Sequence, residues 1–182
     1  MVKIYLVRHG KAATGWGLEV DPGLDDLGRS QAQAAAEILA PLGPLPIISS
    51  PRARAQETAM PLAKIWGIDP AIEDRVGEIR FPAEKSANKV EWLKKIMVDH
   101  WPNLDRNLQQ WRRGVIEALL SIKNDTVVFT HYIAINVAVG RATDDDRVVC
   151  FRPDNASVTI LETHGNSLNL VNRGNEADTK VN

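Results

Sequence analysis

Cysteine is almost absent from this chain of 182 residues, in which only Cys150 is present. A single cysteine cannot close an intramolecular disulfide, and it cannot supply a thiolate cluster for a metal. Cys150 lies between Val149 and Phe151. We therefore expect a buried structural thiol and not a nucleophile.

An excess of one charge is also absent, since 22 Lys and Arg face 23 Asp and Glu. This balance argues against a bulk nucleic acid or an anionic membrane as partner. The opening apolar run, Val2–Val7, is shorter than a signal-peptide core and far below the ~20 residues that span a bilayer. No later run reaches that length without charges, so we expect a cytoplasmic protein.

The remaining composition is that of an ordinary soluble protein, with 44% hydrophobic and 25% charged residues. The length is typical of one globular domain, and we find no repeats or long linker. We therefore expect a single domain over residues 1–172 and a flexible polar tail over 173–182.

Strand and helix patterns alternate along the chain. They predict an α/β, three-layer domain with a mostly parallel central sheet flanked by helices and a small helical insertion near 83–122. The predicted strands cover 2–7, 47–49, 70–73 and 126–130, followed by a hairpin-like end with strands at 148–152, 157–162 and 168–171. The predicted helices cover about 26–40, 52–66, 90–97, 104–122 and 132–140.

Several helix ends carry capping signals. Asp25 or Asp26 is the expected cap of the first helix, and Ser50 that of the second, with Pro51 at its first position. Gly140 is expected to end the helix that follows 126–130. Apolar residues near helical spacing predict the buried side of the first helix: Leu27, Ala34, Ile38 and Leu39.

The two strongest predicted strands end in histidines, His9 and His131. Because the carboxyl ends of parallel strands meet at one edge of a sheet, we expect both imidazoles there, with Ser49 and Ser50 nearby.

Arg8, His9 and Gly10 place a cation, an imidazole and a flexible backbone position at the first strand end. A neutral histidine nitrogen can attack phosphorus, and a guanidinium can hold phosphoryl oxygens. Gly10 permits a sharp turn and a close approach to a ligand. The alternative is a buried polar strand end that backbone groups satisfy.

The stretch from Ser49 to Ala59 offers a helix N-terminus with free N–H groups and a positive dipole end. Arg52 and Arg54 lie roughly 200° apart around that helix, so only one of them is expected to face the crevice. Arg54 is the better placed, although both are alternatively solvated surface charges.

Five segments, taken together and in order, resemble the histidine phosphatase superfamily, which includes phosphoglycerate mutases. The segments are Leu6–Gly10, Asp25–Ala32, the pattern Ser50-Pro51-x-x-Arg54-Ala55-x-x-Thr58-Ala59, Val127–His131 and Asn155–Glu162. The resemblance extends from residue 4 to residue 162 and covers most of the chain.

The resemblance implies that His9 is a nucleophile that forms phosphohistidine, and that Arg8, Arg54 and His131 grip the phosphoryl group. These groups offset the charge on the transferred oxygens, so no metal or other cofactor is expected. Glu78 falls where many members carry the general acid, a role that needs burial or neighbouring negative charge. Nearby carboxylates compete for this role: Glu73, Asp74 and Glu84.

The chain departs from the usual family pattern after each histidine. Lys11 and Thr14 stand where many members have Glu and Asn, and we expect one of them to touch substrate. Tyr132 replaces a glycine, and it either narrows the pocket, bonds a substrate or packs at the helix start.

Histidines and tryptophans outside the motifs carry weaker signals. His100 and His164 are expected at the surface or in packing, with no zinc-ligand spacing. The tryptophans divide between helix-face packing, for Trp92 and Trp111, and a substrate entrance, for Trp16 and Trp101.

The sequence thus predicts a metal-independent phosphatase that hydrolyses a phosphomonoester or phosphoamidate through phosphohistidine at His9. The alternatives are mutase-like phosphoryl transfer, which requires better exclusion of water, and a non-catalytic phosphoryl-binding scaffold. The expected substrate is a small phosphorylated molecule if the 83–122 insertion forms a lid, or a phosphoprotein if the cleft is open.

Overall fold

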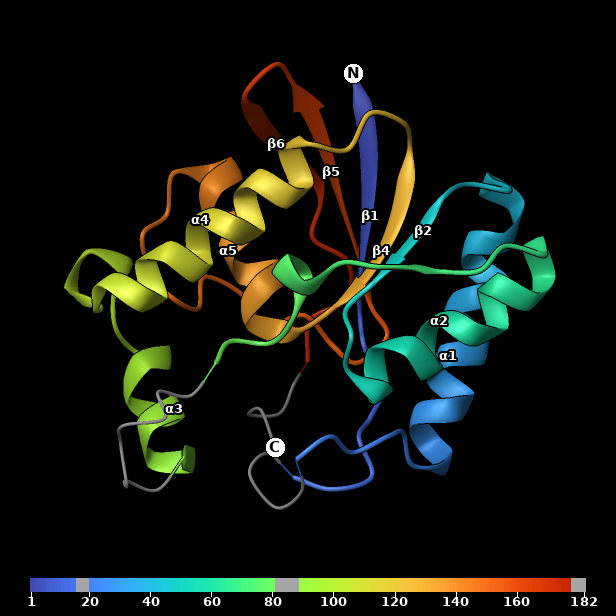
Figure 1. Cartoon of the computed structure of the whole chain (residues 1–182), viewed down its shortest axis with the longest axis horizontal. Helices are drawn as coiled ribbons and strands as arrows, with labels where there is room; N and C mark the ends of the chain where they lie inside the picture. The colour runs from blue at the N-terminus through green and yellow to red at the C-terminus, as the bar shows by residue number, and fades with distance from the viewer. Residues whose placement is uncertain (16–19, 81–88, 178–182) are drawn as a thin grey trace.

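A computed structural model describes residues 1–15, 20–80 and 89–177. Its core is a six-stranded sheet in the order β3-β2-β4-β1-β5-β6 (Figure 1). The central strand, β1 (Val2–Arg8), pairs in parallel with β4 (Thr126–Thr130) and antiparallel with β5 (Val158–His164). The other strands are β2 (Ile47–Ser49), β3 (Ala71–Ile72) and β6 (Ser167–Asn172).

Helices cover both faces of the sheet, which confirms the predicted three-layer α/β class (Figure 1). On one face lie α1 (Asp26–Leu39) and α2 (Ala53–Trp66), and on the other lie α4 (Arg106–Leu120) and α5 (Tyr132–Thr143). Neighbouring β1 residues point to opposite faces, so Leu6 belongs to the core under α5 and Val7 to the core under α1 and α2.

The short α3 (Lys89–Met97) and α4 occupy the described part of the predicted insertion. No helix in the described ranges is long and apolar enough to cross a membrane. Residues 173–177 run beside 152–154, where the Asp154 N–H donates to the Asn175 carbonyl and the Ala177 N–H to the Arg152 carbonyl. The rest of the predicted tail, 178–182, lies outside the described residues.

Helix ends were predicted with mixed success. Asp25 caps α1 through a 2.7 Å bond from the Gly28 N–H, as predicted. The cap of α2 was wrong: the helix begins at Ala53, whose N–H reaches the Asp21 carboxylate at 3.1 Å, while Ser50 Oγ accepts the Arg52 N–H before the helix and contacts His131. The Gly140 stop was also wrong, since α5 continues to Thr143.

The predicted buried side of α1 was wrong in part. Leu27 and Ile38 are 52% and 70% exposed, and Ala34 is exposed too. Close packing of α1 on α2 favours small side chains over large ones at the contact. The buried positions are Gly28, Ala32, Ala35, Ala36 and Leu39.

The predicted strand over 148–152 is irregular chain instead. The buried side chain of Asn136 replaces a strand partner, because its Oδ1 accepts hydrogen bonds from the Cys150 and Phe151 N–H groups at 2.8 and 3.1 Å. Those backbone donors are therefore satisfied without a ladder. Cys150 is half-buried, and burial raises the pKa of its thiol, which agrees with a structural role.

Candidate active site

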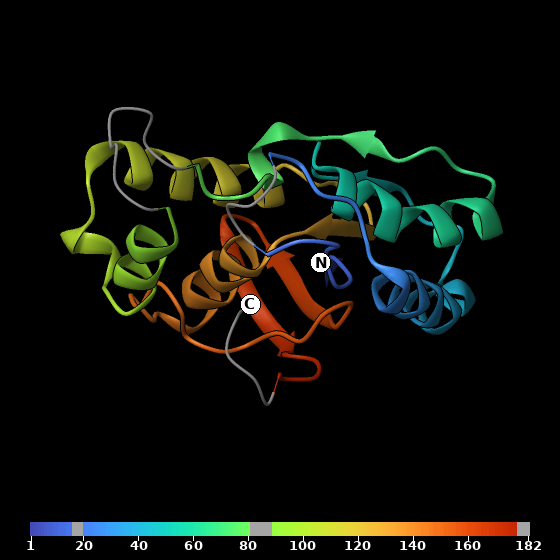
Figure 2. The same ribbon diagram turned by 90° about the horizontal axis from the view of Figure 1, so that it is seen from below.

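Three parallel strands deliver the polar residues to one edge of the sheet, which Figure 2 views end-on. His9 follows β1, Ser50 follows β2 and His131 follows β4. The His9 N–H donates to the Thr130 carbonyl at 3.0 Å, and the Ser50 N–H to the Phe129 carbonyl at 2.9 Å. Backbone bonds thus hold the three strand ends together, as the sequence predicted.

The His9 imidazole is held neutral, with its lone pair on a defined nitrogen. Its Nδ1 lies 2.7 Å from the Gly10 carbonyl. Because that oxygen can only accept, Nδ1 carries the proton and Nε2 carries the lone pair. Burial, helped by Arg54 and Arg8, lowers the pKa of His9 to about 3. His9 is therefore an uncharged nucleophile candidate at neutral pH.

Arg54 links His9 to Glu78. Its Nε donates to His9 Nε2 at 3.2 Å, and its Nη2 pairs with Glu78 Oε2 at 3.2 Å. The Arg54 and Glu78 side chains are 8% and 11% exposed. Arg52 turns the other way and reaches the Val20 carbonyl, so Arg54 alone of this pair contacts the histidine.

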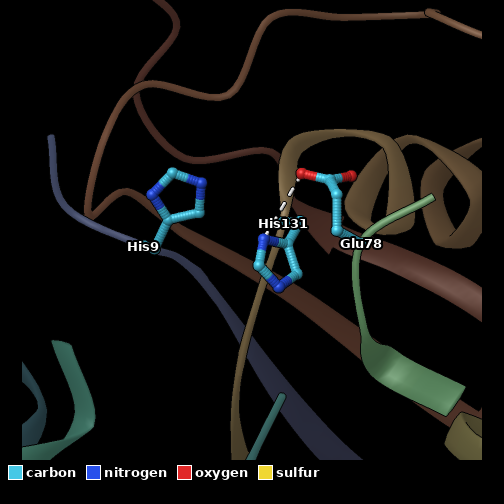
Figure 3. A group of neighbouring side chains, drawn as sticks. All are labelled: His9, Glu78 and His131. Atoms are coloured by element: carbon cyan, nitrogen blue, oxygen red, sulfur yellow. Dashed lines mark ion pairs between the residues drawn. The ribbon is translucent and has the colours of Figure 1, made fainter. Parts of the chain in front are cut away.

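His131 lies beside His9, with ring centroids 5.2 Å apart. Its Nε2 is 2.7 Å from Ser50 Oγ, and its Nδ1 is 3.4 Å from Glu78 Oε2. Figure 3 shows this carboxylate aimed at His131 from the side opposite His9. Burial, helped by the charge of Arg54, places the pKa of His131 well below its usual value.

Arg8, the last residue of β1, completes the group. Its Nη1 donates to the Pro153 carbonyl at 2.9 Å, and its guanidinium lies 5.1 Å from the centre of the Tyr132 ring. Its Nε is buried and has no hydrogen-bond partner among the described residues. A buried donor without a partner is rare in folded proteins and suits an anion as acceptor.

Other acidic candidates turn away from the two histidines. Glu73 is occupied by Arg75 through a 2.7 Å ion pair, and Asp74 is exposed. Glu84 lies outside the described residues. Of the described carboxylates that were considered, Glu78 is the one that contacts His131.

The three residues predicted to contact substrate differ in their surroundings in the structure. Lys11 pairs with Asp25 at 3.0 Å, so its ammonium group lies at the cap of α1. Thr14 is half-buried in the following loop, and Tyr132 packs at the start of α5 against Arg8. The packing role weighed for Tyr132 is therefore present, with its ring beside the arginine of the site.

Trp101 was wrongly predicted at a substrate entrance. It is 1% exposed and stacks on Trp111 with ring centroids 6.1 Å apart, because the 3-10 turn after α3 folds it into the core. Trp16 lies outside the described residues. His100 and His164 are exposed, as predicted.

Supporting residues that sequence reasoning missed fix the position of His9. The Asn155 side chain donates to the His9 carbonyl at 3.1 Å, and Thr58 Oγ1 accepts the Gly10 N–H at 3.0 Å. Thr58 also donates to the Arg54 carbonyl one turn earlier in α2. Both residues lie within the motifs that carried the family resemblance, and that was the available signal.

A side chain at residue 10 would collide with neighbouring backbone. This reason for a glycine differs from the predicted one, which was close approach to a ligand. A Cβ there would lie 2.5 Å from the Gly28 carbonyl oxygen. A Cβ on Gly28 would in turn lie 2.1 Å from the Lys11 carbonyl oxygen. These two glycines therefore let the first turn of α1 lie directly on the backbone that follows the nucleophile candidate.

The charges of the site favour an anion over a cation. Ligand atoms of His9, Glu78 and His131 lie within 4.8 Å of one another, a set that can hold a metal. Arg54, however, contacts two of these three residues, and Arg8 lies nearby. Two guanidiniums repel a cation and match the oxygens of a phosphoryl group.

Comparison with known proteins assigns the family. The sequence model of the histidine phosphatase superfamily (branch 1) matches residues 4–176. The chain belongs to this superfamily. The resemblance read from its motifs is thereby confirmed over nearly the whole chain.

Relatives within the histidine phosphatase superfamily include mycobacterial proteins. A bifunctional protein of Mycobacterium tuberculosis is 28% identical over 94% of this chain and 54% of its own length. A glucosyl-3-phosphoglycerate phosphatase of Mycolicibacterium vanbaalenii is 40% identical over 42% of this chain and 36% of its own. The chain thus spans about half the length, or less, of these curated relatives.

Solved structures of the superfamily share the fold. A mycobacterial glucosyl-3-phosphoglycerate phosphatase, solved with VO3, superposes with a TM-score of 0.75 at 23% identity, over 96% of this chain and 99% of that one. At this identity the likeness shows the fold alone.

Proposed function

We propose that this histidine phosphatase is a metal-independent phosphohydrolase that works through a phosphohistidine at His9. One observation carries the proposal: a neutral His9 Nε2 lies against Arg54, and Arg8, whose Nε is buried and unpaired, is near enough for its charge to lower the pKa of His9. A nucleophile and cationic donors thus converge on a position that suits one tetrahedral phosphoryl group.

In the first step, His9 Nε2 attacks phosphorus, the N–P bond forms and the P–O bond to the leaving group breaks. Arg8, Arg54 and His131 hold the phosphoryl oxygens. Glu78 supplies the proton to the departing oxygen, so that the leaving group departs as an alcohol, or as an amine from a phosphoamidate.

In the second step, water attacks the phosphohistidine while the Glu78 carboxylate removes one of its protons. The N–P bond breaks, inorganic phosphate is released and His9 Nε2 regains its lone pair. Protons balance over the cycle, because Glu78 gives one in the first step and takes one in the second.

The role of Glu78 depends on a change of partners. Without ligand, its carboxylate is ion-paired with Arg54. A phosphoryl group competes for Arg54 and brings negative charge beside Glu78, which favours the protonated carboxyl that the first step needs.

The relatives carry the names of phosphatases and of a probable phosphoglycerate mutase, and we propose hydrolysis as the activity to test first. Glucosyl-3-phosphoglycerate phosphatases are among them, which makes phosphorylated sugar acids the first substrates to test and a small molecule preferable to a phosphoprotein. Mutase-like transfer requires a phosphoenzyme that survives until it donates again, and a scaffold requires binding without turnover.

The test is trapping of the phosphoenzyme under denaturing alkaline conditions, which preserve phosphohistidine. With ³²P-labelled p-nitrophenyl phosphate, whose leaving group departs without a proton, we expect label at His9 in the wild type and more label in Glu78→Gln, because the second step loses its base. His9→Ala should neither label nor hydrolyse, while His164→Ala, which changes an exposed histidine, should match the wild type.

Three outcomes would contradict the mechanism. Turnover without label in either wild type or Glu78→Gln would count against the covalent step. Phosphate binding without hydrolysis of any phosphomonoester would favour the scaffold, and transfer of label to an added alcohol in preference to water would favour the mutase.

A further inference from the structure

A cavity of about 700 Å³ lies outside the group of His9, Glu78 and His131. It is bounded by the end of α3, the irregular segment 147–152 and the stretch 176–177. Figure 2 shows these segments around the start of α5, on the side of the molecule that presents the sheet edge. Its volume falls in the range of about 300–1,000 Å³ that is typical of small-molecule sites.

Tyr132 connects this cavity to the phosphoryl site. Its ring lies on the Arg8 guanidinium. Burial raises the pKa of its hydroxyl, and beyond Arg8 the charged neighbours that act on it include Arg152 and Glu176, both of which line the cavity. One side of Tyr132 therefore belongs to the phosphoryl site, and its hydroxyl lies within electrostatic range of the cavity wall.

The backbone gives a second connection. Pro153, whose carbonyl accepts the Arg8 Nη1 hydrogen bond, directly follows Arg152 of the cavity wall. Pro153 also bridges to Glu176 across the two neighbouring segments. The cavity and the phosphoryl site are thus neighbours, because Arg8 contacts both Tyr132 and Pro153, and Pro153 directly follows Arg152.

The charged residues of the cavity differ in what they already bind. Arg147 is held by Asp145 at 2.6 Å, and Asp99 accepts the His100 N–H at 2.7 Å. The exposed side chains of Arg152 and Glu176 have no hydrogen bond or ion pair within the described ranges. Arg152 is therefore a cation available to a ligand, at the cavity end nearest Arg8.

We propose that this cavity receives the leaving-group part of the substrate and that Arg152 binds a second anionic group on it, a carboxylate or a second phosphate. The inference rests on the proposed phosphatase function. The substrate class is a sugar-sized phosphomonoester with two anionic ends: Arg8 and Arg54 hold the reacting phosphoryl group, Arg152 holds the other end, and Glu176 accepts from hydroxyl groups between them.

The test compares kcat/KM for four phosphomonoesters: p-nitrophenyl phosphate, glucose 6-phosphate, 6-phosphogluconate and glucose 1,6-bisphosphate. The last two add a carboxylate or a second phosphate to a body of similar size, so they separate the two anionic groups. We expect the wild type to prefer at least one of them to glucose 6-phosphate by about 10-fold or more, the usual range for a charge-assisted pair.

Two variants with opposite expected signs exclude a merely structural effect. Arg152→Gln should lower kcat/KM for the preferred substrate with two anionic groups by about 10- to 100-fold. It should leave kcat/KM for p-nitrophenyl phosphate and glucose 6-phosphate within about 2-fold. Glu176→Gln should raise kcat/KM for the substrate with two anionic groups, because it removes a negative charge from the cavity wall that also holds Arg152. The control is Arg113→Gln, which removes an exposed arginine from α4 and should change nothing.

An equal loss for all four substrates in Arg152→Gln, or no loss for any, would overturn the assignment of the cavity while the phosphatase function stood. Absence of p-nitrophenyl phosphate hydrolysis together with absence of trapped phosphohistidine would overturn both.

Discussion

The phosphoryl site and the neighbouring cavity are built in opposite ways. The first consists of residues at strand ends, and its basic side chains are almost fully buried: Arg8, His9, Arg54 and His131 are 7%, 8%, 6% and 0% exposed. The second lies between irregular segments, and two of its charged residues, Arg152 and Glu176, are exposed. Rigid elements thus hold the groups that we propose to react, whereas loops, which tolerate change, hold the groups that we propose to select the substrate.

The largest effect that sharpens this comparison is expected from Arg54→Lys. Lysine cannot reach both His9 Nε2 and Glu78 Oε2 with a planar fork, so kcat/KM should fall about 10²- to 10³-fold, equally for every phosphomonoester. Arg52→Lys, two residues earlier on the outward side, should stay within about 2-fold. A loss confined to substrates with two anionic groups would show that Arg54 selects leaving groups. The distinction between a buried reacting site and an exposed selecting cavity would then fail.

A smaller effect is expected from Ser50→Ala, which removes the hydroxyl 2.7 Å from His131 Nε2. A buried polar atom left unpaired costs about 1–3 kcal/mol, so we expect a lower free energy of unfolding and a roughly 10-fold lower kcat for all substrates. Ser49→Ala is the matched control, because its buried hydroxyl donates to the Ser50 carbonyl and does not contact the histidine. Urea denaturation and steady-state kinetics measure both. Equal kcat values for the two variants would mean that Ser50 does not position His131.

The last effect is a change of slope, in the pH dependence of stability. His9 titrates at about 3 in the folded chain and near 6.5 when unfolded. Between these values the unfolded state binds the extra proton, so the free energy of unfolding falls as pH falls, by up to about 1.4 kcal/mol per unit for this residue. His9→Gln should flatten that slope between pH 6.5 and 4, and the exposed His164→Gln should not. Denaturation curves with the same slope for both variants would contradict the burial of a neutral His9.

Much of the catalytic side of this comparison was predictable from sequence. Short buried runs that end in His9 and His131 predict two strands and the sheet edge at which both strands end. The alternation of strands with helices indicates that the two strands are parallel. Arg54 followed from its angular position in α2. The roles assigned to these residues, and to Glu78, remain predictions.

The cavity side was not predictable, because its structure depends on tertiary contacts. The apolar run Val148–Arg152 reads as a strand, yet the side chain of Asn136 bonds its N–H groups and bends it away from the sheet. Trp101 reads as a loop residue, yet it is buried against Trp111. In α1, periodicity could not distinguish the face that fits closely on α2 from the one that carries Leu27 and Ile38.

The central position of β1 also constrains the order in which the molecule can fold. The strand that leads to the nucleophile candidate pairs with β4 and β5, which begin at Thr126 and Val158. Contacts between such distant segments form late, because long loops must close first. During synthesis on the ribosome, β1 therefore has neither of its neighbouring strands to pair with until most of the chain has been made. A product cut short before β5 would carry every side chain of the phosphoryl site, and it would still lack the strand that completes the sheet around His9.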